Sequence, residues 1–157
     1  MSFNQNNLSL LNFKFKLDKT PELEFRVQKV SLPGMTLGTV DLPTPFVKMP
    51  ISGNIKYDEF AVTFMVGENM KDYLEIYDWM VKLGYPDRLG QYQNILSDCS
   101  VIILNSSSKA NINVRFTDAF PVGISGIDMD STLQEVQYAT ATARFRFLRW
   151  YIEPFNA

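Results

Sequence analysis

The sequence predicts a mainly β protein, an antiparallel β-barrel or sandwich of about eight strands with one amphipathic α-helix (about 69–83) and an extended arm (about 31–55). Short segments of alternating apolar and polar residues recur along the chain, separated by turn residues. Aromatic side chains, which pack well on pleated sheets, are abundant, with 12 Phe and 7 Tyr. Only one segment has helical periodicity. With 157 residues and no evident linker, we expect one domain, 1–157.

The first alternating segment covers residues 12–17 and predicts a half-buried strand, with Phe13, Phe15 and Leu17 facing inward. A turn at 18–21 and a second strand at 25–30 would complete a first hairpin. Residues 1–11 before it are rich in Asn and Gln but contain leucines. They form either an unstructured terminus or an N-terminal arm that becomes ordered on a partner, in which case Leu8 and Leu10 are candidate interface residues.

Residues 31–50 contain four prolines, which cannot donate to a sheet ladder, so no central strand is expected there. A self-packed loop is one interpretation, but so long an irregular segment is uncommon inside a compact domain. We favour an extended arm, or a pair of edge strands, that packs on a neighbouring subunit. Its apolar residues are then candidate interface residues: Leu37, Val40, Phe46, Val47 and Ile51.

Residues 60–66 predict a strand packed on the core, since Phe60, Val62 and Phe64 share one face. The period then changes to three and four, which predicts the helix at 69–83. Asn69 is the expected N-cap, and Gly84 is expected to end the helix in the left-handed conformation. The expected inward stripe of this helix consists of Met70, Tyr73, Leu74, Tyr77, Met80 and Val81.

The rest of the chain predicts strands and loops. After a loop at 85–97, a strand at 99–104, a turn at 105–109 and a strand at 110–116 predict a second hairpin. Residues 117–124 are interpreted as a crossover loop, and 127–133 as a strand with Asp128 and Asp130 facing outward. A single long strand over 138–152 is expected to close the structure.

Composition excludes several functions. The net charge of −2 lacks the basic surplus of a nucleic-acid binder. The absence of histidine removes Ser-His and Cys-His catalysis and zinc sites with His ligands. The single Cys99 cannot form an internal disulfide, which favours a reducing compartment. The first residues have no basic region and no apolar run is long enough to span a bilayer, so we expect neither signal peptide nor membrane segment.

Three groups of residues are candidate chemical sites. Asp128 and Asp130 form either a carboxylate pair for acid–base or metal chemistry or the solvated face of a strand. We favour the solvated face because no other acid or histidine can be assigned to them. A basic and aromatic cluster near the C-terminus fits a nucleic-acid surface or an ion-paired strand face, and the acidic chain favours the second. Cys99 fits a buried apolar position better than a nucleophile. We therefore expect no enzyme, metal, cofactor or small-molecule substrate. The cluster contains Arg144, Arg146, Arg149, Trp150 and Tyr151.

Three segments of the C-terminal third carry a resemblance to a known family: Ala-Phe-Pro-Val-Gly-Ile-Ser-Gly-Ile-Asp-Met-Asp at 119–130, Glu-Val-Gln at 135–137 and the strand ending in Tyr-Ile-Glu at 151–153. They resemble the tail-tube proteins of contractile-tailed bacteriophages. That family ends with an aromatic-Pro turn, an alternating strand with acids, a short acidic turn and a final alternating strand ending in aromatics. The Leu32-Pro33-Gly34 turn, the strand–helix pair at 60–83 and the chain length are also similar, so the resemblance covers roughly residues 12–153.

The resemblance implies hexameric rings that stack into a tube, with a tail sheath around it and the genome passing through without specific binding. Baseplate or hub, tail-terminator and tape-measure proteins would be its other partners. It would be located in the virion tail and assembled in the host cytoplasm. We expect Asp128 and Asp130 to face the lumen and repel phosphate. The alternatives are a baseplate, initiator or terminator ring of the same tail, or a separate β-barrel that binds a ligand.

Overall fold

A computed structural model of the chain describes residues 7–19, 26–88 and 95–154. The described part is mainly β, with one α-helix, as predicted. No helix in these three ranges is long and apolar enough to cross a membrane. The elements are β1 (Phe13–Leu17), β2 (Val27–Ser31), β3 (Met35–Pro43), β4 (Lys48–Tyr57), β5 (Phe60–Met65), α2 (Lys71–Gly84), β6 (Ser97–Leu104), β7 (Ala110–Ile124), β8 (Thr140–Arg146) and β9 (Arg149–Pro154).

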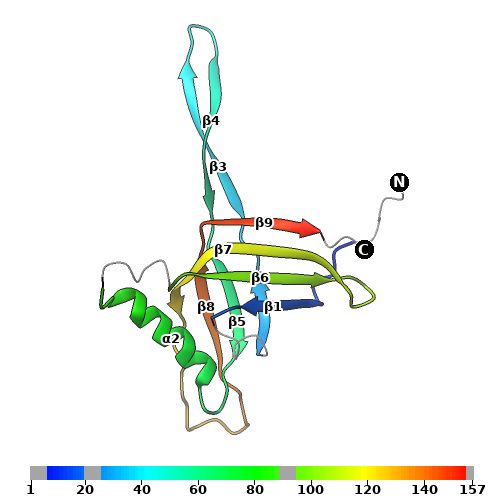
Figure 1. The fold of residues 1–157 in the computed structure, drawn as a ribbon, viewed down its shortest axis with the longest axis vertical. Helices are drawn as coiled ribbons and strands as arrows, with labels where there is room; N and C mark the ends of the chain where they lie inside the picture. The colour runs from blue at the N-terminus through cyan, green and yellow to red at the C-terminus, as the bar shows by residue number, and fades with distance from the viewer. Residues whose placement is uncertain (1–6, 20–25, 89–94, 155–157) are drawn as a thin grey trace.

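All pairings are antiparallel, and the main sheet has the order β1-β6-β7-β8-β5-β2, with β9 also paired to β7. The long strand β7 joins two layers, because its first part pairs with β6 and β9 and its last part with β8. Figure 1 shows β1, β6, β7 and β9 running across the view while β5 and β8 run crosswise to them. The sheet therefore folds around a core without closing into a barrel. Of the two architectures that we predicted, a barrel or a sandwich, the barrel is wrong.

The core lies between the two layers. Phe60, fully buried on β5, stacks on Phe116 of β7 with ring centroids 4.5 Å apart and on Phe145 of β8 at 5.1 Å. Helix α2 covers this aromatic group with Trp79, whose ring lies 6.1 Å from that of Phe145. Burial of this apolar surface is the main contribution to folding stability. The inward faces predicted for β1 and β5 are confirmed.

The predicted first hairpin is wrong. Strand β1 pairs with β6, and β2 pairs with β5, so the two strands lie at opposite ends of the main sheet. Their short separation in the sequence suggested direct pairing, whereas each strand buries its apolar face against a partner much later in the chain. The turn between them falls mostly outside the described residues. The second predicted hairpin, β6–β7, is confirmed, with Asn105 accepting the N–H groups of Ser107 and Lys109 in its turn.

Three predictions for the C-terminal third are wrong. Residues 117–124 continue β7, with a local irregularity at Asp118, whose φ is +52°. Residues 127–133 form an exposed loop instead of a strand, because no strand pairs with them. The segment 138–152 is two strands, β8 and β9, separated at Phe147 and Leu148, and these strands pair with different parts of β7. Alternation alone did not reveal this break.

Helix α2 begins after Met70, which has a left-handed φ of +54° and makes no side-chain cap, so the N-cap predicted at Asn69 is wrong. Gly84 is the last helical residue and has no left-handed φ, so the left-handed end predicted there is wrong. The N–H of Tyr85 bonds Val81 O beyond it. Ile76 and Trp79 are buried, while Tyr73 and Met80 pack beside them on the core. Of the other apolar residues of the predicted stripe, Met70 is partly buried, whereas Leu74, Tyr77 and Val81 are exposed.

Asp72 connects α2 to the main sheet. Its buried carboxylate accepts the N–H of Gly67 at 3.1 Å and that of Tyr73 at 2.9 Å, and Arg26 Nε lies 3.8 Å away. We expect Asp72→Ala to lower the free energy of unfolding by about 1–3 kcal/mol, because the N–H of Gly67 loses its acceptor. Urea denaturation measures this loss. The exposed Asp78→Ala is the control, and an equal effect of both variants would contradict the prediction.

Candidate functional site

The segment predicted as an arm forms a two-stranded antiparallel hairpin, β3–β4, which extends away from the main sheet (Figure 1). At its base, the N–H of Asp58 bonds Gly34 O at 3.1 Å and the ring of Tyr57 lies 5.5 Å from that of Phe147. Every residue of β3 is exposed, as is every residue of β4 except Tyr57, so the self-packed loop is wrong. The exposed large apolar side chains are Met35, Leu37, Val40, Leu42, Phe46, Val47, Met49, Ile51 and Ile55.

The hairpin tip presents an aromatic side chain to solvent. Thr44 closes the turn, since its hydroxyl accepts the N–H of Val47 at 3.1 Å and also bonds Val47 O. Phe46, between them, is 97% exposed. All five arm residues that the sequence singled out therefore lie on one hairpin. The sequence missed Met35, Leu42, Met49 and Ile55, although the same apolar content in a proline-rich segment would have indicated them.

Leu8 and Leu10 lie elsewhere. They line a cavity of about 190 Å³ beside the ends of the main sheet, together with Phe13 on β1 and Val30 on β2. Both leucines remain exposed, Leu10 at 85%. The cavity is apolar, and its remaining lining residues are Ser9, Asn12, Leu32, Val101 and Ile103. The segment with Leu8 and Leu10 thus lies against the ends of the sheet, but its leucine side chains stay exposed to solvent. These leucines therefore offer a second apolar surface.

Asp128 and Asp130 lie in the exposed loop between β7 and β8, at the end of the molecule opposite the hairpin tip (Figure 1). The carboxylate of Asp130 accepts the N–H of Thr132 at 2.8 Å and its hydroxyl at 2.6 Å. These two hydrogen bonds lower the pKa of Asp130, so this carboxyl stays charged to a lower pH than usual. The loop also exposes Met129, Val136 and Tyr138, of which only Met129 lies within the strand predicted at 127–133.

The outer side of α2 is a further apolar surface that sequence reasoning assigned to the core. Leu74, Tyr77 and Val81 recur at helical spacing and are all exposed. The helix has two apolar stripes in its sequence, and the pattern did not reveal which stripe faces the core. Ile76 and Trp79 face the core, so the other stripe remains available to a partner.

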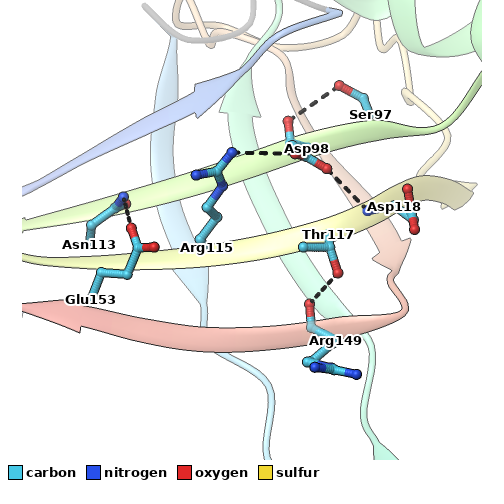
Figure 2. Close-up of polar contacts among 8 residues, drawn as sticks. All are labelled: Ser97, Asp98, Asn113, Arg115, Thr117, Asp118, Arg149 and Glu153. Carbon is cyan, nitrogen blue, oxygen red and sulfur yellow. Dashed lines mark hydrogen bonds and ion pairs between the residues drawn. The ribbon is translucent and has the colours of Figure 1, made fainter.

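Figure 2 shows polar groups of β6, β7 and β9, most of which lie on the outward face of these strands, whereas Ser97 is buried. Asp98 pairs with Arg115 at 3.5 Å and accepts the N–H of Asp118 at 3.3 Å. Across β7 and β9, Asn113 donates to Glu153 at 3.4 Å. These groups bond across neighbouring strands of one surface and do not converge on a pocket. They have the arrangement of a solvated sheet face rather than of a catalytic site.

The C-terminal arginines belong to two different strands. Arg144 and Arg146 lie on β8, whereas Arg149 lies on β9. Arg144 pairs with Glu59 at 3.4 Å, which supports the interpretation as an ion-paired strand face. Cys99 is buried, as predicted, and burial raises the pKa of its thiol well above its usual value. Within residues 7–19, 26–88 and 95–154, no three His, Cys, Asp or Glu residues come together as metal ligands.

Comparisons with known proteins agree with this picture. A family model described as "Phage tail tube protein" matches residues 2–153. A cryo-EM structure of the anti-feeding prophage cap has a TM-score of 0.74 at 12% identity and covers 99% of this chain and 96% of that one. The sheath-tube complex of an extracellular contractile injection system, PVC, has the same TM-score and identity, and the match covers 96% of this chain and 94% of that one. Hcp1 from Flavobacterium johnsoniae has a TM-score of 0.54 at 14% identity, with 93% and 99% covered. A search of curated proteins gave no significant match.

Proposed function

The chain belongs to the phage tail tube protein family, and from this we propose that its copies form hexameric rings that stack into the tube of a contractile tail, the conduit for genome delivery. Its role is that of a structural tail-tube protein. No catalytic step is proposed for any residue. The observation that carries the proposal is the β3–β4 hairpin, whose apolar side chains are left without a partner by the chain's own fold.

The exposed apolar surface of this hairpin and its length both support assembly through it. Soluble monomers rarely expose apolar patches above a few hundred Å² outside binding sites, yet the hairpin exposes nine large apolar side chains. A strand of the length of β4 spans roughly 30 Å at about 3.3 Å per residue. A compact chain of this size is about 40 Å across. The hairpin can therefore reach over most of an adjacent copy, which suits a contact between or within rings.

The other surfaces take secondary roles in this proposal. Leu8 and Leu10 become buried when rings stack, together with the cavity beside β1 and β2. Asp128 and Asp130 face the lumen, where carboxylates repel phosphate and let DNA slide. The net charge of −2 suits a conduit that does not bind nucleic acid. An assembled structure with both aspartates on the outer wall would contradict the lumen assignment.

The proposed partners follow from the position of a tail tube. They are the tail sheath protein, the baseplate or hub proteins, the tail-terminator protein and the tape-measure protein. The protein would be assembled in the host cytoplasm and remain in the virion tail. A second candidate role is a capping, initiating or baseplate ring of the same tail, because the fold is as similar to a chain of the anti-feeding prophage cap as to one of the PVC sheath-tube complex.

Negative-stain electron microscopy of the purified full chain at several concentrations, together with its solution mass, tests the proposal. We expect six-fold rings and tubes of stacked rings. Single rings that never stack would favour the capping role. A strict monomer at every concentration, also in the presence of a preformed baseplate, would overturn self-assembly and favour a separate ligand-binding protein.

A further inference from the structure

Resting on the proposed self-assembly, we infer that the β3–β4 hairpin is two-sided. The base of the hairpin binds one copy of the chain through one face, and its outer half binds a different copy through the opposite face. The inference comes from the strand register and from two glycines at the middle of the hairpin. It goes beyond self-assembly because it assigns two separate partners to one hairpin.

The register places the apolar pairs on opposite faces. Residues directly across an antiparallel pair share a face, and successive residues alternate between faces. Near the base, Leu37 pairs with Ile55, and Met35 with Tyr57, all on one face. In the outer half, the apolar residues of β3 have even numbers, whereas those near the base have odd numbers. Val40 pairs with Ile51, and Leu42 with Met49, on the other face.

A β-bulge accommodates this change of face. Between the pairs Leu37–Ile55 and Thr39–Ser52, β3 advances by two residues and β4 by three. The extra residue of β4 keeps the apolar residues of β3 opposite apolar residues of β4 on both sides of the bulge. A Cβ on Gly53 would lie 3.2 Å from Gly38 O, so glycine permits the close backbone approach. Without the extra residue, Val40 would face a polar residue of β4 instead of Ile51.

The reverse sides of both halves are polar. Behind the apolar pairs at the base lie Thr36 and Lys56, and in the outer half Thr39 lies opposite Ser52 and Asp41 opposite Pro50. One partner surface lying along one face would meet apolar groups over half of the hairpin and polar groups over the other half. Two surfaces, one on each face, bury all the apolar pairs. Because a tube consists of many copies of this chain, each copy has several neighbours to supply both surfaces.

The hairpin edges are less suited to such contacts. Pro43 and Pro50 lack the N–H group that an added strand would use. At most about half of the hairpin's backbone N–H and C=O groups are paired across β3 and β4, because those of alternate residues point outward from the two edges. The apolar side chains that the register separates lie on the faces, so burying them requires contacts through the faces.

Photocrosslinking of the full chain tests the inference. A benzophenone amino acid replaces Leu37, Leu42 or both, and the substituted protein is assembled with a large excess of the unsubstituted chain. Because unsubstituted copies surround each substituted one, irradiation reports how many copies one hairpin contacts. We expect dimers from each single substitution and covalent trimers from the double one. Benzophenone at Thr36 or Asp41, one residue away on the polar faces, is the matched control and should give little product.

Each possible outcome either supports or overturns the inference. Trimers from the doubly substituted chain, with Leu37 and Leu42 linked to different peptides, support two partners. Dimers as the largest product of the double substitution, product from only one of the two positions, or equal yields from the controls would overturn the two-sided hairpin while leaving self-assembly intact. Failure of the unsubstituted chain to assemble would remove the proposed function, and this inference with it.

Discussion

Replacing Phe46 and Val47 at the hairpin tip with aspartate should abolish ring and tube formation while leaving the protein folded. Both side chains are exposed in the isolated chain, Phe46 almost completely, so the change removes no contact within the fold. In an assembled tube, however, two unpaired carboxylates would have to be buried. Such a charge at an interface costs about 2–5 kcal/mol, or a factor of more than about 30 in affinity at 1.4 kcal/mol per tenfold.

Solution mass and electron microscopy measure this loss, and thermal unfolding confirms that the fold is unchanged. Phe46→Leu with Val47→Ile is the matched control, because it keeps the tip apolar and should still assemble. If the aspartate variant assembled normally, the tip would not be an interface. A large fall in Tm without loss of assembly would instead mean that the tip packs on its own chain.

Phe60→Ala should have the largest effect on stability, lowering the free energy of unfolding by about 3–5 kcal/mol. Phe60 is fully buried and its ring touches three other phenylalanine rings, those of Phe116, Phe145 and Phe147. Its removal leaves a cavity where the two layers of the sheet meet. A domain of this kind has a total stability of about 5–15 kcal/mol, so much of the native stability would be lost.

Urea denaturation provides the measurement, and Phe46→Ala is the control with the same change of residue. Because Phe46 lies outside the core, this control should change the stability by no more than about 0.5 kcal/mol. The two phenylalanines thus separate folding from assembly: one substitution affects the monomer and the other affects the tube. Similar effects of both substitutions on stability would show that the hairpin tip contributes to the fold.

The sequence predicted well where a local pattern is enough. The alternation in β1 and β5 identified their buried faces, and the period change after Met65 placed the helix to within two residues. The prolines and apolar residues of 31–55 indicated an extended arm with an exposed apolar surface. The burial of Cys99 was also predicted correctly. These features depend on side chains near one another in the sequence, so periodicity and residue type report them directly.

Sequence reasoning failed where the choice of partner matters. The segment 127–133 alternates like a strand but has no strand beside it, and a strand exists only when another one pairs with it. The sequence likewise could not show that β1 pairs with β6, or that α2 turns Ile76 and Trp79 inward instead of Leu74 and Tyr77. Two faces of one helix can have similar apolar character, and only packing against the whole core selects between them.

By itself, then, the sequence determined the β class, the single helix, the apolar arm and the absence of histidine chemistry. The tertiary structure decided the order of the strands, the open sheet and the register of the β3–β4 hairpin. That register depends on a bulge between Gly38 and the residues opposite it, and it assigns each apolar pair to a face. Residue types are local, whereas pairing and register are relations between distant segments, and these relations are fixed only when the whole chain buries its core.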